Sequence, residues 1–130
     1  MIKNELTYKI IGCGMKVHNT LGPGFQEVIY QRCLDIELER EALSFIREKE
    51  HTIYYDGIDV GTRRADFVVE NKVVVEIKAL VAFEDVHLAQ AKNYVVAYNF
   101  LLGLLINFGG KSLIYKLVFH PKLSESGFTG

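Results

Sequence analysis

The sequence has no tryptophan and only two prolines and two cysteines in 130 residues. Cys13 and Cys33 form no CxxC pair and no disulfide framework, which is typical of a reducing compartment. The longest apolar run, residues 100–106, is far shorter than the ~20 residues of a membrane span. The first residues lack the apolar stretch and cleavage site of a signal peptide. We therefore expect a cytoplasmic protein with no membrane segment.

Neither sign of charge is in excess, because 15 Lys and Arg residues stand against 16 Asp and Glu residues. This balance argues against a histone-like positive coat but allows a local basic groove. The sequence contains no GxxxxGK[ST] or GxGxxG pattern, so nothing in it favours a nucleotide site. The four histidines and two cysteines lack zinc-ligand spacing. With 49% hydrophobic residues, the chain is expected to fold around a single core.

Hydrophobic spacing and turn residues predict an α/β protein. The helix-breaking stretch "LGPG" at 21–24 separates two helices, and the second is expected to run from 25 into the low 40s with an acidic tail to residue 50. A hairpin is expected around Asp56-Gly57, a strong hairpin dipeptide. The other expected elements are strands at 64–69 and 73–79, a helix at 84–100, and strands at 101–108 and 113–119. Residues 1–120 are expected to form a single domain, followed by a polar tail at 121–130.

The stretch "RRADFVVENKVVVEIKA" at 63–79 places charged residues inside apolar strands. Side chains alternate along a strand, so hydrophobic matching predicts an antiparallel pair with a three-residue loop at 70–72. Phe67 then faces Val75, and Val69 faces Val73. Ala65 is expected on the same apolar face as Phe67.

On the opposite face, this register sets Asp66 against Glu76 and Arg64 against Lys78, with facing Cβ atoms about 5 Å apart. Two facing carboxylates are destabilising unless a cation lies between them or one takes a proton. Oxygen ligands favour a hard ion, Mg²⁺ or Mn²⁺. The alternative is that Asp66 lies at a frayed strand start and that Glu76 pairs with Lys78 or Arg64 in solvent.

The spacing D-x₉-E-x-K, formed by Asp66, Glu76 and Lys78, resembles the signature of the PD-(D/E)XK nuclease superfamily. "GFQEVIY" at 24–30 matches a GxxExxY pattern, and "QAKNY" at 90–94 matches a QxxxY element. "GLLINFG" resembles the strand that follows that element. Over residues 5–119 the chain resembles the GxxExxY protein family of that superfamily. The resemblance implies an α/β, restriction-endonuclease-like core with a mixed central sheet flanked by helices.

The resemblance also implies a Mg²⁺ (or Mn²⁺) site. The metal ligands would be Asp66, Glu76, the backbone carbonyl of Ile77, and Glu27. Lys78 would orient the attacking water and offset phosphate charge. The implied catalytic residues are Glu27, Asp66, Glu76, Lys78 and Gln90.

The nucleic-acid contacts would come from residues on the two helices and the first strand of the pair: Tyr30, Arg64, His87, Lys92 and Tyr94. Simpler structural interpretations of these residues stay open. Glu27 would then only complement a helix dipole, and Gln90 with Tyr94 would be a polar helix edge beside a half-buried tyrosine.

The function expected from these patterns is a divalent-metal-dependent nuclease that hydrolyses phosphodiester bonds, with DNA favoured over RNA as the substrate. The alternative is a catalytically inactive nucleic-acid-binding or protein-interaction module that keeps the fold. The strand expected at 113–119 would lie at a sheet edge, which leaves a homodimer open.

Overall fold

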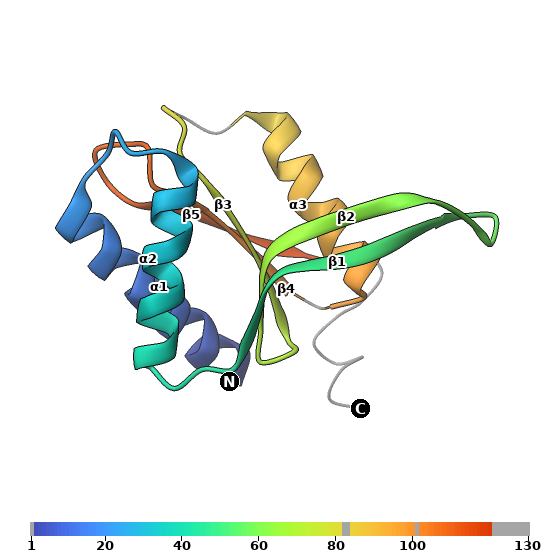
Figure 1. Ribbon diagram of the computed structural model, residues 1–130, viewed down its shortest axis with the longest axis horizontal. Coiled ribbons are helices and arrows are strands. Elements are labelled where there is room, and N and C mark those ends of the chain that lie inside the picture. Colours follow the sequence, from blue (N-terminus) through green and yellow to red (C-terminus); the bar gives the residue numbers. More distant parts are fainter. Residues whose placement is uncertain (1, 82–83, 101, 121–130) are drawn as a thin grey trace.

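The computed structural model describes residues 2–81, 84–100 and 102–120. Its centre is a sheet of five strands in the order β1-β2-β3-β4-β5 (Figure 1). β3 and β4 are parallel, and the other neighbours are antiparallel. The sheet is therefore mixed, as predicted. The strands are β1 (Phe45–Tyr55), β2 (Ile58–Val69), β3 (Val73–Lys78), β4 (Leu102–Asn107) and β5 (Ile114–Phe119).

Helices flank the sheet on both faces. α1 (Ile2–Leu21) and α2 (Glu27–Arg40) lie on one side, and α3 (Asp85–Tyr98) lies on the other (Figure 1). α3 connects β3 to β4, because parallel neighbours need a crossover connection. None of the helices in the described part of the chain is long and apolar enough to cross a membrane.

The main core lies between the sheet and the α1/α2 pair, and two smaller clusters lie under α3. All six residues of β4 are buried, as expected for a strand covered on both faces. The predicted strand at 101–108 is thus confirmed over 102–107, while Phe108 follows the strand and position 101 is outside the described residues. The main core includes Ile10, Leu34, Leu38, Phe67, Val75, Leu104, Ile106 and Phe108.

The predicted acidic tail of the second helix is wrong, because α2 ends at Arg40 and residues 45–50 belong to β1. Ala42 has a positive φ of 57°, and the Leu43 amide donates to the Leu38 carbonyl, which closes the helix. Burial alternates along residues 45–50, as in a strand with one covered face. The alternating charges were therefore those of a half-exposed strand.

The predicted register between β2 and β3 is confirmed where the two strands pair, but the pairing ends at Phe67 and Val75, so the expected pairs Asp66–Glu76 and Arg64–Lys78 are not part of the ladder. Phe67 pairs with Val75 and Val69 with Val73. The expected position of Ala65 is wrong, since it packs under α3 with Val68 while Phe67 packs on the opposite face.

The alternation of side chains is therefore interrupted at Asp66. The residue opposite it in β1 is Glu48, which lies between the pairs Arg47–Phe67 and Lys49–Ala65 and has a positive φ of 54°. Both strands are distorted at this point.

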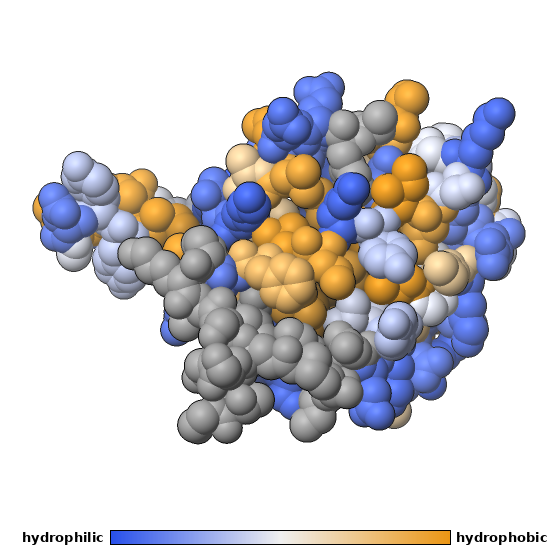
Figure 2. Space-filling view, turned by 180° about the vertical axis from the view of Figure 1, so that it is seen from behind, coloured by the Kyte–Doolittle hydropathy of each residue, from blue (hydrophilic) through white to orange (hydrophobic). Residues whose placement is uncertain are grey.

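β1 and β2 extend beyond the other strands as a two-stranded arm (Figure 1). The arm turns at Asp56 and Gly57, whose φ values of 50° and 76° confirm the predicted hairpin. Tyr54, Tyr55 and Ile58 near the tip are 64–70% exposed. Seen from behind, the arm projects from the body with apolar side chains beside polar ones (Figure 2).

The contact between α3 and the sheet depends on Gly103 in β4. A Cβ atom at this position would overlap with Val95 Cγ2 of α3. Only a residue without a side chain allows the helix to lie this close to the strand. Gly103 therefore sets the spacing between α3 and the sheet.

Candidate functional site

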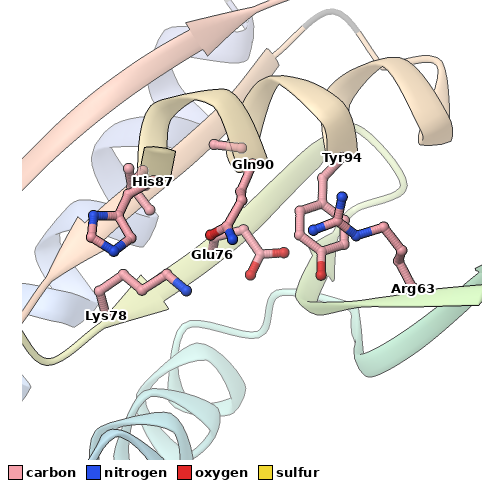
Figure 3. Close-up of a pocket in the computed structure, with 8 residues that line it drawn as sticks. Arg63, Glu76, Lys78, His87, Gln90 and Tyr94 are labelled. Carbon is pink, nitrogen blue, oxygen red and sulfur yellow. The ribbon is translucent and has the colours of Figure 1, made fainter. Parts of the chain in front are cut away.

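A pocket of about 140 Å³ opens between α3 and the end of β3. In Figure 3 the side chains of Lys78, Glu76 and Gln90 point into the same space, and Arg63 meets Tyr94 at one side of it. Strand β3 supplies an acid and a base two residues apart on one face, and α3 supplies polar groups from above. The lining residues are Arg63, Glu76, Lys78, His87, Gln90, Ala91, Tyr94 and Leu105.

Asp66 and Glu76 meet where β2 and β3 diverge. The Ile77 amide donates to Asp66 Oδ2 at 2.7 Å, which holds the carboxylate of Asp66 against β3. Glu76 is 7% exposed, and its Oε1 is buried without a hydrogen-bond partner among the described residues.

Both carboxyl groups bind protons more tightly than usual. Burial, and after it the negative charge of Asp66, together raise the pKa of Glu76 to about 10. Burial also raises the pKa of Asp66, although the hydrogen bond from the Ile77 amide opposes this. The pair therefore needs a proton or a cation to neutralise it.

Glu27, in the first turn of α2, is an exposed residue on the opposite side of the sheet to α3, near Asp66. Its pKa is raised by burial and by the negative charge of Asp66, and the positive charge of Lys78 opposes both effects. The carboxyl of Glu27 therefore lies within electrostatic reach of Asp66 and Lys78. The prediction that Glu27 contributes to the site stays a prediction, but its place in the fold is compatible with it.

A hard divalent ion fits the donor set at this position. The buried, unpartnered Oε1 of Glu76 and the carboxylate of Asp66 are anionic oxygen ligands of the kind that Mg²⁺ and Mn²⁺ prefer. Among the described residues, however, no group of three or more His, Cys, Asp or Glu side chains is arranged to hold a metal ion. The site thus supplies two close carboxylates, and the remaining positions around an ion would have to be filled by backbone oxygen, by water, or by Glu27 directly or through water.

Three predicted residues of α3 line the pocket: His87, Gln90 and Tyr94. Nδ1 of His87 accepts a hydrogen bond of 2.9 Å from the Glu84 amide. In the neutral imidazole the proton is therefore on Nε2. The spacing of three and four residues places all three side chains on one helix face, as the sequence suggested.

Arg63, rather than Arg64, is the arginine of the pocket. Its guanidinium lies 4.8 Å from the centre of the Tyr94 ring, in cation–π geometry. Arg64 is exposed and pairs with Glu50 at 3.4 Å. The interruption at Asp66 turns Arg63 toward α3. A regular alternation of side chains along β2 would place Arg63 on the opposite face of the sheet, so the sequence pattern does not predict this position.

Two other predicted nucleic-acid contacts lie outside the pocket. Lys92 is exposed on α3 and does not line it, so its role stays a prediction. For Tyr30 the prediction of a nucleic-acid contact is wrong, because the residue is completely buried. Its hydroxyl donates to the Gly22 carbonyl at 2.6 Å and accepts from the Phe25 amide at 3.2 Å. Tyr30 holds the turn between α1 and α2.

A mixed sheet of five strands with helices on both faces defines a restriction-endonuclease-like α/β protein. A family model of the PD-(D/E)XK nuclease superfamily matches residues 4–117, and the chain belongs to this superfamily. The fold is similar to the crystal structure of SSO0001, with a TM-score of 0.56 and 22% identity over 77% of this chain. The matched region spans 52% of the SSO0001 chain. No curated protein matches the sequence significantly.

Proposed function

We propose that the protein is a divalent-metal-dependent nuclease that hydrolyses phosphodiester bonds, with DNA as its substrate in preference to RNA. We also propose that it belongs to the GxxExxY branch of its superfamily. The observation that carries the proposal is the buried pair of Asp66 and Glu76, with an unpartnered oxygen on Glu76 and with Lys78 beside it. Such a pair is costly in a protein that has no cation to bind.

In this mechanism Asp66 and Glu76 hold Mg²⁺ or Mn²⁺, and the Ile77 carbonyl and Glu27 complete the protein ligands. The bound ion would supply a Lewis acid that acidifies water and stabilises charge on the phosphate oxygens. Lys78 and Gln90 line the same pocket and orient the water.

The substrate phosphate would be held at the other side of the pocket. Arg63 supports this role, since a guanidinium binds phosphate oxygens well and the Tyr94 ring fixes its plane. His87 can donate from Nε2. Arg64 and Lys92 would contact phosphates further along the nucleic-acid strand.

The test combines Mn²⁺ binding by calorimetry with cleavage of linear, nicked and single-stranded DNA and of RNA. Asp66→Asn changes volume little, so the metal-free protein should fold, but its Mn²⁺ affinity should fall sharply. Lys78→Ala should bind Mn²⁺ at least as well as wild type, because a nearby positive charge is removed, and should still lose most cleavage. Wild-type protein that binds no Mn²⁺, or an Asp66→Asn variant that binds it equally well, would contradict the mechanism.

The second candidate is a nucleic-acid-binding or protein-interaction module that lacks catalysis. It is favoured because, in the described part of the chain, no group of three or more His, Cys, Asp or Glu side chains is arranged to hold a metal ion. Metal binding as described above without cleavage of any DNA or RNA would support it. A homodimer through the edge strand β5 is a separate proposal, which sedimentation of the full chain would test.

A further inference from the structure

Gln31 is a buried polar residue that directly contacts Asp66. It lies on α2, four residues after Glu27, and is 5% exposed. Its Nε2 donates a hydrogen bond of 3.3 Å to Asp66 Oδ1. Arg47 of β1 donates from Nη2 to Gln31 Oε1 at 3.1 Å and from Nη1 to Asp35 Oδ2 at 3.4 Å. A chain of side-chain contacts therefore runs from Asp35 to Asp66.

The direction of these hydrogen bonds is fixed by chemistry. A guanidinium has donors only, so Arg47 must face the oxygen of the Gln31 amide. The NH₂ group of the same amide then faces Asp66. Asp35 in turn holds the guanidinium of Arg47 in place. Gln31 is thus constrained to act as a donor to Asp66.

The carboxylate of Asp66 is held on both oxygens. The Ile77 amide donates to Oδ2 and Gln31 donates to Oδ1. Each carboxylate oxygen keeps a further lone pair for another partner. A carboxylate fixed in this way loses less conformational freedom when it binds a cation, which is how outer contacts raise metal affinity.

Stability alone does not explain this arrangement. The Nε of Arg47 is buried without a hydrogen-bond partner among the described residues, and an unmade hydrogen bond costs stability. The guanidinium instead directs its two terminal nitrogens to Gln31 and Asp35. Arg47 therefore orients the Gln31 amide, although one of its own N–H donors is left without a hydrogen bond among the described residues.

We propose that Gln31 is a positioning residue for Asp66, and that Arg47 and Asp35 fix the orientation of the Gln31 amide. Gln31 sets the direction in which the carboxylate of Asp66 presents its free lone pairs. The inference rests on the proposed function, because it assigns Gln31 a role in binding the divalent ion.

The test is Mn²⁺ calorimetry on Gln31→Met, which keeps the side-chain length and removes both polar groups. The Mn²⁺ affinity should fall by about tenfold or more, the range found when outer contacts of metal ligands are removed. The matched control is Gln26→Met, at the exposed N-cap of the same helix, where the side chain makes no capping hydrogen bond. The control should bind Mn²⁺ within about twofold of wild type.

A cleavage assay separates positioning from loss of fold. In Gln31→Met the metal concentration for half-maximal rate should rise about tenfold, while the rate at saturating metal stays within about twofold of wild type. A purely structural role would lower the saturating rate and leave the half-maximal concentration unchanged.

Arg47→Lys provides a second variant in case Gln31→Met does not fold. A lysine keeps the charge but cannot hold Asp35 and the Gln31 amide with a planar fork, so the Mn²⁺ affinity should again fall. Its control is Arg40→Lys, at an exposed arginine of α2 that pairs with the half-buried Glu37. Wild-type binding in Gln31→Met, or in Arg47→Lys if Gln31→Met is unfolded, overturns the inference alone. Wild-type protein that binds no Mn²⁺ overturns the proposed function as well.

Discussion

Glu76→Gln should stabilise the metal-free protein, because the native state forces this side chain to hold a proton. The pKa of Glu76 rises from 4.5 to about 10 on folding, chiefly through burial. The folded state therefore binds the proton more tightly than the unfolded chain, and stability falls as pH rises above 4.5. Between pH 4.5 and pH 7, at 1.36 kcal/mol per pH unit, the loss amounts to about 3 kcal/mol. Glutamine has nearly the same shape and does not titrate, so this loss disappears.

The assay is urea unfolding of wild type and Glu76→Gln between pH 4 and pH 9, with EDTA present. The difference in unfolding free energy should be small near pH 4 and should grow with pH to about 3 kcal/mol at pH 7 in favour of glutamine. Subtracting the two curves largely removes the titration of other groups. Excess Mn²⁺ should then stabilise wild type and not the variant, because the ion binds the ionised carboxylate.

A difference that stays flat between pH 5 and pH 8 would refute the reasoning. It would mean that Glu76 is ionised in the metal-free protein and is already compensated by Lys78. Burial would then not be the dominant influence on this carboxyl group.

Two other substitutions test separate parts of the structure. Tyr30→Phe should lower stability by about 1–3 kcal/mol, because it leaves the Gly22 carbonyl and the Phe25 amide without their partner. It should leave Mn²⁺ affinity unchanged, and an effect on metal binding with unaltered stability would contradict the structural role. Arg63→Met should weaken binding of DNA to catalytically inactive protein and reduce the salt dependence of log K by about one. Lys111→Met, outside the pocket, is its control, and equal effects of the two would place Arg63 among ordinary surface charges.

Much of the site could be predicted from local patterns. The register of β2 and β3 followed from matching Phe67 and Val69 to Val75 and Val73, since a slip by one residue would bury charge. The positions of Glu76 and Lys78 then followed from alternation along β3.

The remaining parts of the site depend on features that the alternation of side chains along a strand cannot predict. The distortion at Asp66 and Glu48 moves Ala65 and Arg63 to the α3 side. The partners of Gln31 are Asp66 of β2 and Arg47 of β1, which are distant from it in sequence. A single buried glutamine in a helix produces no periodic pattern that would predict these contacts. Tyr30 is part of the GxxExxY pattern, but its hydroxyl is used inside the fold.

The absence of a side chain at Gly103 also bears on how this protein could be altered. Gln90 and Tyr94 line the pocket together with Glu76 because α3 lies close to the sheet, and α3 lies close because Gly103 leaves room for Val95. A methyl group added at position 103 would overlap with Val95, and we expect α3 to move away from the sheet and the pocket to widen, without a change to any residue that lines it. Trimming Val95 to alanine in the same chain would let the helix return. Substitutions at Gly103 and Val95 would therefore change the depth of the pocket, and with it the access of the substrate. The carboxylates and the lysine of the site would stay unchanged.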